Sequence, residues 1–243
     1  MNLARIDTPV TYLLIALCVL AFLPVANNLL PTQNAFALYL PANPLYQPWQ
    51  YLSSLFMHGG LTHLLFNMLA LWMFGSALER WWGSLRFLVF YLLCGIGAGL
   101  IYTWINEYQF NQLYQQIRNL GVSAAGIEMI LEQATYPANL PGLTEALVGE
   151  FYTLYHAPVV GASGAIYGIL AAYALCFPNN RLMLIFLPYP IPAKYFVPVL
   201  LLIDLLSGLT GFSIFGGNIA HFAHVGGAIV GFALTFVLGR KMG

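Results

Sequence analysis

Ser163 lies in the segment GASGAIYG, among small residues near the start of a long apolar stretch. A serine in a membrane helix can simply hydrogen-bond to its own helix and allow neighbouring helices to pack closely. It becomes a nucleophile when a histidine takes its proton, because the alkoxide can then attack a carbonyl carbon. His224, in the segment AHVGGAIVGF, is followed by Gly227 and Gly231, which give its helix a small-residue face. The two segments predict a serine and a histidine that meet between helices.

His63 and Asn67 form a second candidate pair. They are four residues apart in the segment HLLFN, so both side chains lie on one face of a helix. Acyl transfer needs hydrogen-bond donors aimed at the oxyanion that develops on the substrate, and this pair could supply two of them. The alternative for either residue alone is a hydrogen bond that holds two helices together.

These side chains are set in a chain with the composition of a membrane protein. It has 243 residues, of which 60% are hydrophobic and 7% charged, against roughly 25% charged residues in soluble domains. A membrane helix needs about 20 apolar residues, and six runs approach or exceed that length: 9–30, 59–78, 87–105, 157–177, 195–212 and 219–239. The sequence therefore predicts an all-α, polytopic fold with one membrane domain over residues 1–243.

The eight basic residues predict the orientation. With the N-terminus in the cytoplasm, Arg118 alone lies outside. The other seven then obey the positive-inside rule: Arg5, Arg80, Arg86, Arg181, Lys194, Arg240 and Lys241. The polar candidates all fall in the outer half of their runs: Ser163, His63, Asn67, His221 and His224. Eight acidic residues balance the charge and no basic stripe occurs, so no nucleic-acid partner is expected.

The region at about 106–156 is a long, hydrophilic outer loop. Five apolar residues recur in it at helical spacing: Phe110, Leu113, Tyr114, Ile117 and Leu120. This pattern predicts a short amphipathic helix lying on the membrane or on the protein core. The loop could be a gate or docking cap for substrates, or a plain solvated helical insertion. On the inner side, prolines at 188, 190 and 192 exclude a continuing helix, so we expect the apolar stretch before them to lie along the membrane interface.

Three segments resemble the motifs of one family, the rhomboid intramembrane serine proteases. GASGAIYG is similar to their GxSGxxY motif, HLLFN to HxxxN and AHVGGAIVG to AHxxGxxxG, in the family's order along the chain. The resemblance implies a six-helix rhomboid fold and a catalytic dyad, with Ser163 as nucleophile and His224 as base, and no third carboxylate. It implies no cofactor and no metal.

The same resemblance implies supporting roles for other residues. His63, Asn67 and the backbone N–H of Ser163 would form the oxyanion hole. Tyr167 would pack against the catalytic histidine. Gly161 would leave room beside the oxyanion hole.

His221 competes with His224, since it also follows an alanine and lies one turn away. The motif placed on His221 would put His224 where the family has glycine, so we expect His224 to be the base and His221 to line a water-filled mouth.

Asp204, the acid of the fifth run, could be a third catalytic residue. Because the family works with a dyad, we expect Asp204 instead to serve helix packing or to line a cavity. The family often has Trp-Arg in its first loop, whereas this chain has Trp49 and Gln50, which leaves any role of that arginine open.

Two other function classes compete with a protease. A metal site or metal transporter could combine the two histidines of the sixth run with His58 and His63. However, HExxH is absent, no carboxylate accompanies the histidines in the sequence, and the serine motif would be unexplained. A rhomboid-like pseudoenzyme would bind membrane proteins without cutting them, but its usual sign, loss of the serine or the histidine, is absent.

The sequence thus predicts a serine endopeptidase of the bacterial inner membrane, with both termini cytoplasmic. We expect an aqueous pocket, open to the outer side, that brings water to Ser163. A peptide bond inside a helix is shielded, so the substrate must unwind locally. The expected partners are the lipid bilayer and single-pass membrane proteins with small or helix-breaking residues near the outer end of their span. The sequence specifies no oligomeric state.

Overall fold

The computed structural model describes residues 7–26, 35–136, 140–184, 187–211 and 220–238. Its helices in chain order are α1 (Pro9–Ala26), α3 (Gln50–Ser53), α4 (Leu61–Ala70), α5 (Ser76–Trp82), α6 (Ser84–Asn119), α7 (Ala124–Gln133), α8 (Glu145–His156), α9 (Ser163–Cys176), α10 (Ala193–Thr210) and α11 (His221–Leu238). A 3₁₀ turn (Ser54–Phe56) follows α3, and a π-helical turn (Leu71–Gly75) joins α4 to α5. The predicted all-α, polytopic fold class is confirmed.

Each of the six apolar runs is largely helical, but the helices differ in length. Within the described residues, four are long and apolar enough to cross a membrane: Leu61–Trp82, Ser84–Asn119, Ala193–Thr210 and His221–Leu238. The other two, Pro9–Pro24 and Ser163–Cys176, are shorter apolar helices. At 1.5 Å per residue, the 14 residues of α9 extend about 21 Å, whereas the hydrocarbon core of a bilayer is about 30 Å thick. The end of α9 that carries Ser163 can therefore lie below the membrane surface.

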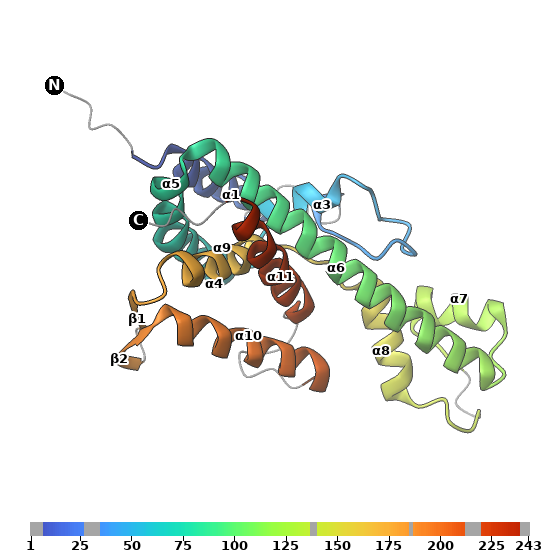
Figure 1. Ribbon diagram of the computed structural model, residues 1–243. Helices are drawn as coiled ribbons and strands as arrows, with labels where there is room; N and C mark the ends of the chain where they lie inside the picture. The colour runs from blue at the N-terminus through green and yellow to red at the C-terminus, as the bar shows by residue number, and fades with distance from the viewer. Residues whose placement is uncertain (1–6, 27–34, 137–139, 185–186, 212–219, 239–243) are drawn as a thin grey trace.

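α9 is the central helix of the bundle. It packs against α6 and α11, which also pack against each other, and α10 contacts α11 and α9. Figure 1 shows α1, α4, α5 and α9 gathered at one end of the long helix α6. The main apolar core includes Leu14, Leu71, Phe87, Tyr91 and Ile169. Because α9 is enclosed by these neighbours, the position of Ser163 at its start is well defined.

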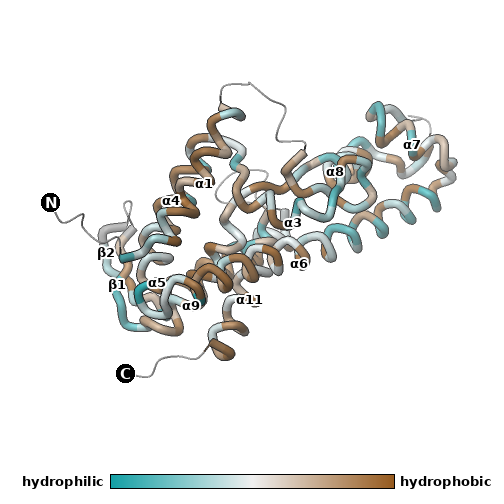
Figure 2. Tube along the Cα trace, turned by 90° about the horizontal axis from the view of Figure 1, so that it is seen from above, coloured by the Kyte–Doolittle hydropathy of each residue, from teal (hydrophilic) through white to brown (hydrophobic). Residues whose placement is uncertain are grey.

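Most of the described residues in the region 106–156 are helical, which is more helix than the one short segment predicted within this loop. α6 has 36 residues and extends about 54 Å, so residues 110–119 continue this helix well beyond the membrane-spanning length. Their apolar side chains pack against α7 and α8 in a second core, which includes Phe110, Ile117, Ile130, Leu147 and Phe151. Figure 2 shows the more hydrophilic colouring of this end of the molecule. The helix predicted from the apolar spacing of Phe110 to Ile117 is confirmed, but it is not short: it is the end of α6, and α7 and α8 cover its apolar face. We call α7, α8 and residues 106–119 the helical cap.

Backbone hydrogen bonds tie the first loop to the segment before α9. Leu38 and Val159 pair as an isolated antiparallel bridge, with N···O distances of 2.9 and 2.8 Å. The N–H of Gly161 donates to the carbonyl oxygen of Ser54 at 2.9 Å. The chain that leads into Ser163 is thereby held against the first loop.

A hairpin of two antiparallel strands, β1 (Arg181–Leu184) and β2 (Leu187–Pro192), connects α9 to α10. Arg181 lies opposite Pro192, and Leu182 lies opposite Ile191. The prolines exclude a helix here, as the sequence predicted, but the strand pairing was not predicted. A two-stranded ribbon tolerates proline because each strand has a free edge where no N–H is needed.

Candidate active site

Ser163 and His224 meet where α9 and α11 pack together. Ser163 is the first residue of α9, and His224 lies in the first turn of α11. Nε2 of His224 is 2.9 Å from Oγ of Ser163, which is a normal hydrogen-bonding distance. A hydroxyl that donates to an imidazole nitrogen in this way can be activated as a nucleophile.

Glycines on both helices allow this close approach. A Cβ on Gly227 would collide with the backbone of Gly164, and a Cβ on Gly231 would collide with the backbone of Gly168. The small-residue face of α11 therefore packs directly against the small residues of α9. The distance between the serine and the histidine depends on this backbone contact.

The carboxylate of Asp204, on α10, joins both histidines of α11. Its Oδ1 is 3.1 Å from Nδ1 of His224 and 2.6 Å from Nδ1 of His221, and its Oδ2 accepts a hydrogen bond from the hydroxyl of Tyr167. Asp204 is 2% exposed and His221 is 8% exposed. The structure thus differs from the expected dyad without a carboxylate, and it buries His221 instead of placing it in a water-filled mouth.

The ring of Tyr167 lies flat against the imidazole of His224. The ring centroids are 4.2 Å apart and the planes are 10° from parallel. Tyr167 is one turn after Ser163 in α9, so the helix that carries the serine also holds one face of the histidine ring.

His63 and Asn67 lie on α4, close to the start of α9. A Cβ on Gly161 would be 2.8 Å from Cε1 and 2.9 Å from Nε2 of His63, and the φ of Gly161, +128°, lies in the region that favours glycine. Asn67 is buried, and its Nδ2 donates to the carbonyl oxygen of His63 at 2.8 Å. This bond uses one N–H of the Asn67 amide, and the second N–H of the same group can donate toward a substrate oxyanion.

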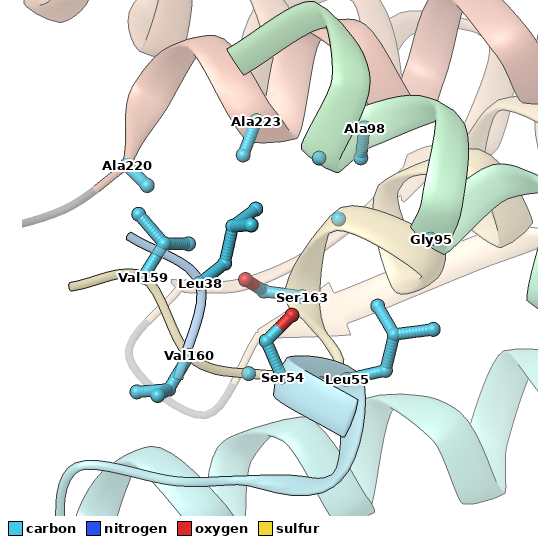
Figure 3. A pocket seen from close by; sticks show the side chains of 13 residues that line it. Leu38, Ser54, Leu55, Gly95, Ala98, Val159, Val160, Ser163, Ala220 and Ala223 are labelled. Carbon is cyan, nitrogen blue, oxygen red and sulfur yellow. The ribbon is translucent and has the colours of Figure 1, made fainter. Parts of the chain in front are cut away.

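A small cavity borders Ser163 (Figure 3). Its volume is about 20 Å³, which is room for one water molecule. The hydroxyls of Ser54 and Ser163 extend into it, and much of the remaining wall is apolar, including Leu38, Ala98 and Val160. The candidate nucleophile therefore borders a space with polar partners for a water molecule.

The chain matches the family described as Rhomboid domain over residues 46–241, a range that includes all the candidate site residues. The chain belongs to the rhomboid family. The resemblance carried by its three motifs is confirmed. Family membership and the long apolar helices make it an integral membrane protein.

Rhomboid relatives are found in several organisms. Rhomboid protease GluP of Bacillus subtilis is 30% identical over 234 residues, which cover 94% of this chain and 34% of that protein. Rhomboid protease AarA of Providencia stuartii is 28% identical over 192 residues, which cover 75% of this chain and 53% of that protein. Rhomboid protein 1, mitochondrial, of Saccharomyces cerevisiae is 27% identical over 180 residues, covering 74% and 39%. The chain thus spans about half or less of the length of these relatives.

Gln50 has a structural role in the first loop of this rhomboid protein. The side chain is 0% exposed. Its Oε1 accepts hydrogen bonds from the backbone N–H groups of Tyr39 and Gln47, at 3.3 and 3.0 Å, and its Nε2 donates to the carbonyl oxygen of Leu45 at 2.8 Å. Glutamine, at the position where the sequence resemblance suggested arginine, therefore organises the loop through neutral hydrogen bonds.

Two further side chains of the site were not predicted as its members. Asp204 had the stronger sequence signal, because a lone acid in an apolar run is costly and needs partners. Ser54 had none, since it belongs to no motif and reaches the cavity only through the folding of the first loop. The contacts of both residues come from elements distant in sequence.

The rival metal site takes a different form from the one predicted. Among the described residues, the group whose possible ligand atoms lie within 4.8 Å of one another consists of Asp204, His221 and His224. His58 and His63 pack against each other, with ring centroids 5.2 Å apart. The expectation that no carboxylate accompanies the histidines is wrong for the folded chain. However, Oδ1 of Asp204 lies at hydrogen-bonding distance from Nδ1 of both histidines of α11, so hydrogen bonds account for the contacts in this group.

Proposed function

We propose that this rhomboid protein is an intramembrane serine endopeptidase that cuts transmembrane segments of membrane proteins near their outer end. The observation that carries the proposal is the 2.9 Å contact between Nε2 of His224 and Oγ of Ser163. Ser163 is the nucleophile and His224 is the base. Two of the relatives described above are named as proteases, which supports the same reaction here.

The reaction begins when Oγ of Ser163 attacks the substrate carbonyl carbon and its proton passes to Nε2 of His224. The negative charge that develops on the carbonyl oxygen is stabilised by the backbone N–H of Ser163 together with His63 and Asn67. His224 then gives the proton to the leaving amine as the C–N bond breaks. A water molecule hydrolyses the acyl-enzyme by the same steps, and the cavity beside Ser163 can hold that water.

The short helix α9 favours substrates that enter from within the membrane. Its length places Ser163 below the membrane surface if the other end of the helix reaches the inner interface. A helical peptide bond is shielded by its own hydrogen bonds, so the substrate must unwind before attack. Single-pass proteins with small or helix-breaking residues near the outer end of their span meet this requirement, and the lipid bilayer is the other partner.

We further propose one membrane domain in the bacterial inner membrane, with both termini in the cytoplasm. This orientation places seven of the eight basic residues on the inner side. The helical cap then lies on the outer side, as does Ser163, because residues 157–162 connect α8 directly to α9.

The experiment that tests the proposal labels the detergent-purified protein with a fluorophosphonate probe and measures cleavage of a model transmembrane substrate. We expect Ser163→Ala and His224→Ala to abolish both signals. His221→Ala is expected to keep measurable labelling, since the Nε2 of His224 remains beside Ser163.

Two outcomes contradict parts of the proposal. If His221→Ala is the inactive variant and His224→Ala is active, the base has been assigned to the wrong histidine. If the wild-type protein neither labels nor cleaves, the chain is a rhomboid-like protein that binds membrane proteins without cutting them.

A further inference from the structure

We propose that Asp204 is a positioning residue that completes a Ser163–His224–Asp204 triad. This inference rests on the proposed function, because it concerns the base of that same reaction. Asp204 lies on α10, 20 residues before His224 in the chain, and reaches the site only through the packing of α10 against α11 and α9.

The burial of Asp204 is compensated by partners on two other helices. An ionised carboxylate at 2% exposure is unfavourable unless hydrogen bonds replace its water. Oδ1 contacts the Nδ1 atoms of His221 and His224, and Oδ2 accepts the hydroxyl proton of Tyr167 in a hydrogen bond. Both oxygens are therefore satisfied by groups that touch or neighbour the base.

The arrangement uses both ring nitrogens of His224. A carboxylate can only accept hydrogen bonds, so its position beside Nδ1 requires the proton of the neutral imidazole to be on Nδ1. Nε2 then carries the lone pair and faces the hydroxyl of Ser163 at 2.9 Å. When Nε2 takes the serine proton, the imidazolium that forms lies against the negative charge of Asp204, as in other serine hydrolases with this geometry.

His221 holds the carboxylate in place. Its Nδ1 is 2.6 Å from Oδ1 of Asp204, closer than the 3.1 Å of His224. Two histidines thus share one carboxylate oxygen, yet the Nε2 of His224 is the one that contacts Ser163. The structure assigns the two neighbouring histidines different tasks, one as base and one as an anchor for Asp204.

The isosteric substitution Asp204→Asn separates positioning from packing. The amide fills the same volume, but when its Nδ2 donates toward Nδ1 of His224 it favours the tautomer with the proton on Nε2. That tautomer cannot accept the proton of Ser163. We expect kcat for cleavage of the model substrate to fall about 10²- to 10⁴-fold, with KM changed less than about threefold.

The test uses the full chain in detergent and two readouts. Cleavage kinetics are measured for wild type, Asp204→Asn, Asp204→Glu and the control Thr235→Val, which alters a buried hydroxyl of α11 that bonds to its own helix. Nitrogen-15 NMR of histidine-labelled protein, with His224→Gln to assign the signal, reports which ring nitrogen of His224 is protonated. We expect Nδ1–H in wild type, Nε2–H in Asp204→Asn, partial recovery of kcat in Asp204→Glu and unchanged kcat in Thr235→Val.

The NMR readout distinguishes failure of this inference from failure of the proposed function. If wild type does not cleave but shows Nδ1–H on His224, and Asp204→Asn reverses it, Asp204 positions the histidine and the protease proposal fails. An Nε2–H tautomer in wild type overturns the triad even if Asp204→Asn does not fold. A folded Asp204→Asn variant that keeps more than about a third of wild-type kcat also overturns it, since a helix-packing role then suffices.

Discussion

The phenol ring of Tyr167 stacks on the imidazole of His224, with centroids 4.2 Å apart, while its hydroxyl donates to the carboxylate of Asp204. One side chain of α9 therefore contacts the candidate base and the residue that orients it. The ring contact and the hydrogen bond can be separated by substitution.

Tyr167→Phe keeps the stacked ring and removes the hydroxyl. We expect kcat/KM for a model transmembrane substrate to fall about fivefold, the equivalent of one hydrogen bond of roughly 1 kcal/mol. Tyr167→Ala also removes the stacking, worth about 0.5–1.5 kcal/mol more, and is expected to lower kcat/KM about 50-fold. Equal activities of the two variants would show that the ring contact has no catalytic effect.

Gly161→Ala places a methyl group against the ring of His63. The new Cβ would be 2.8 Å from Cε1 of that ring, at a backbone φ of +128° that disfavours alanine. We expect at least about a tenfold loss of cleavage, because strain of 1–3 kcal/mol falls beside the candidate oxyanion hole. Gly60→Ala is the matched control, since a Cβ there has nothing within 4 Å and its φ of 178° is extended backbone. Comparable activity in both variants would contradict the steric argument.

Glu79 anchors the start of α1. Its Oε1 accepts the backbone N–H of Val10 and the hydroxyl of Ser84, at 2.9 and 2.6 Å, and its Oε2 accepts the N–H and the hydroxyl of Thr11, both at 2.7 Å. Glu79→Ala leaves the buried Thr11 donors and the partly buried donors of Val10 and Ser84 without this acceptor, so we expect a loss of about 3 kcal/mol of stability. The melting temperature in detergent should fall clearly, while that of Glu150→Ala, an exposed control, should not. A wild-type melting temperature for Glu79→Ala would show that water or another group replaces the carboxylate.

His58 makes stability depend on pH. The ring is 0% exposed, and this burial, with a smaller contribution from the nearby His63, lowers the pKa of His58 to about 4. An unfolded histidine has a pKa of about 6.5, so as the pH falls from about 6.5 toward 4 the unfolded chain binds a proton that the folded chain does not. Stability from the neutral ring is therefore present above pH 6.5 and is lost below it.

The measurement is the melting temperature of wild type and His58→Phe at several pH values between 7.5 and 4.5. His58→Phe keeps a buried ring but has no titrating group, so its melting temperature should fall less on acidification. Carboxylates that also titrate are common to both proteins and cancel in the difference. Parallel curves would mean that His58 titrates normally.

The sequence alone determined the family, the fold class and the candidate catalytic side chains. Lipid provides no hydrogen bonds, so a spanning chain must use long apolar helices, and these are visible as runs of residues. Ser163, His224, His63 and Asn67 stood out for the same reason, because polar groups in such runs need partners. The spacing of His63 and Asn67, which puts both on one face of a helix, can be read from the local sequence.

Only the tertiary structure decided how side chains from different helices meet. The contacts of Asp204 with His221 and His224 depend on the packing of α10 against α11, which no local periodicity encodes. The length of α6 was missed for a related reason: the sequence predicted a helix at 110–119, but not that it continues α6 and is covered by α7 and α8. Helical periodicity specifies which face of a helix is apolar, and the three-dimensional packing decides what covers that face.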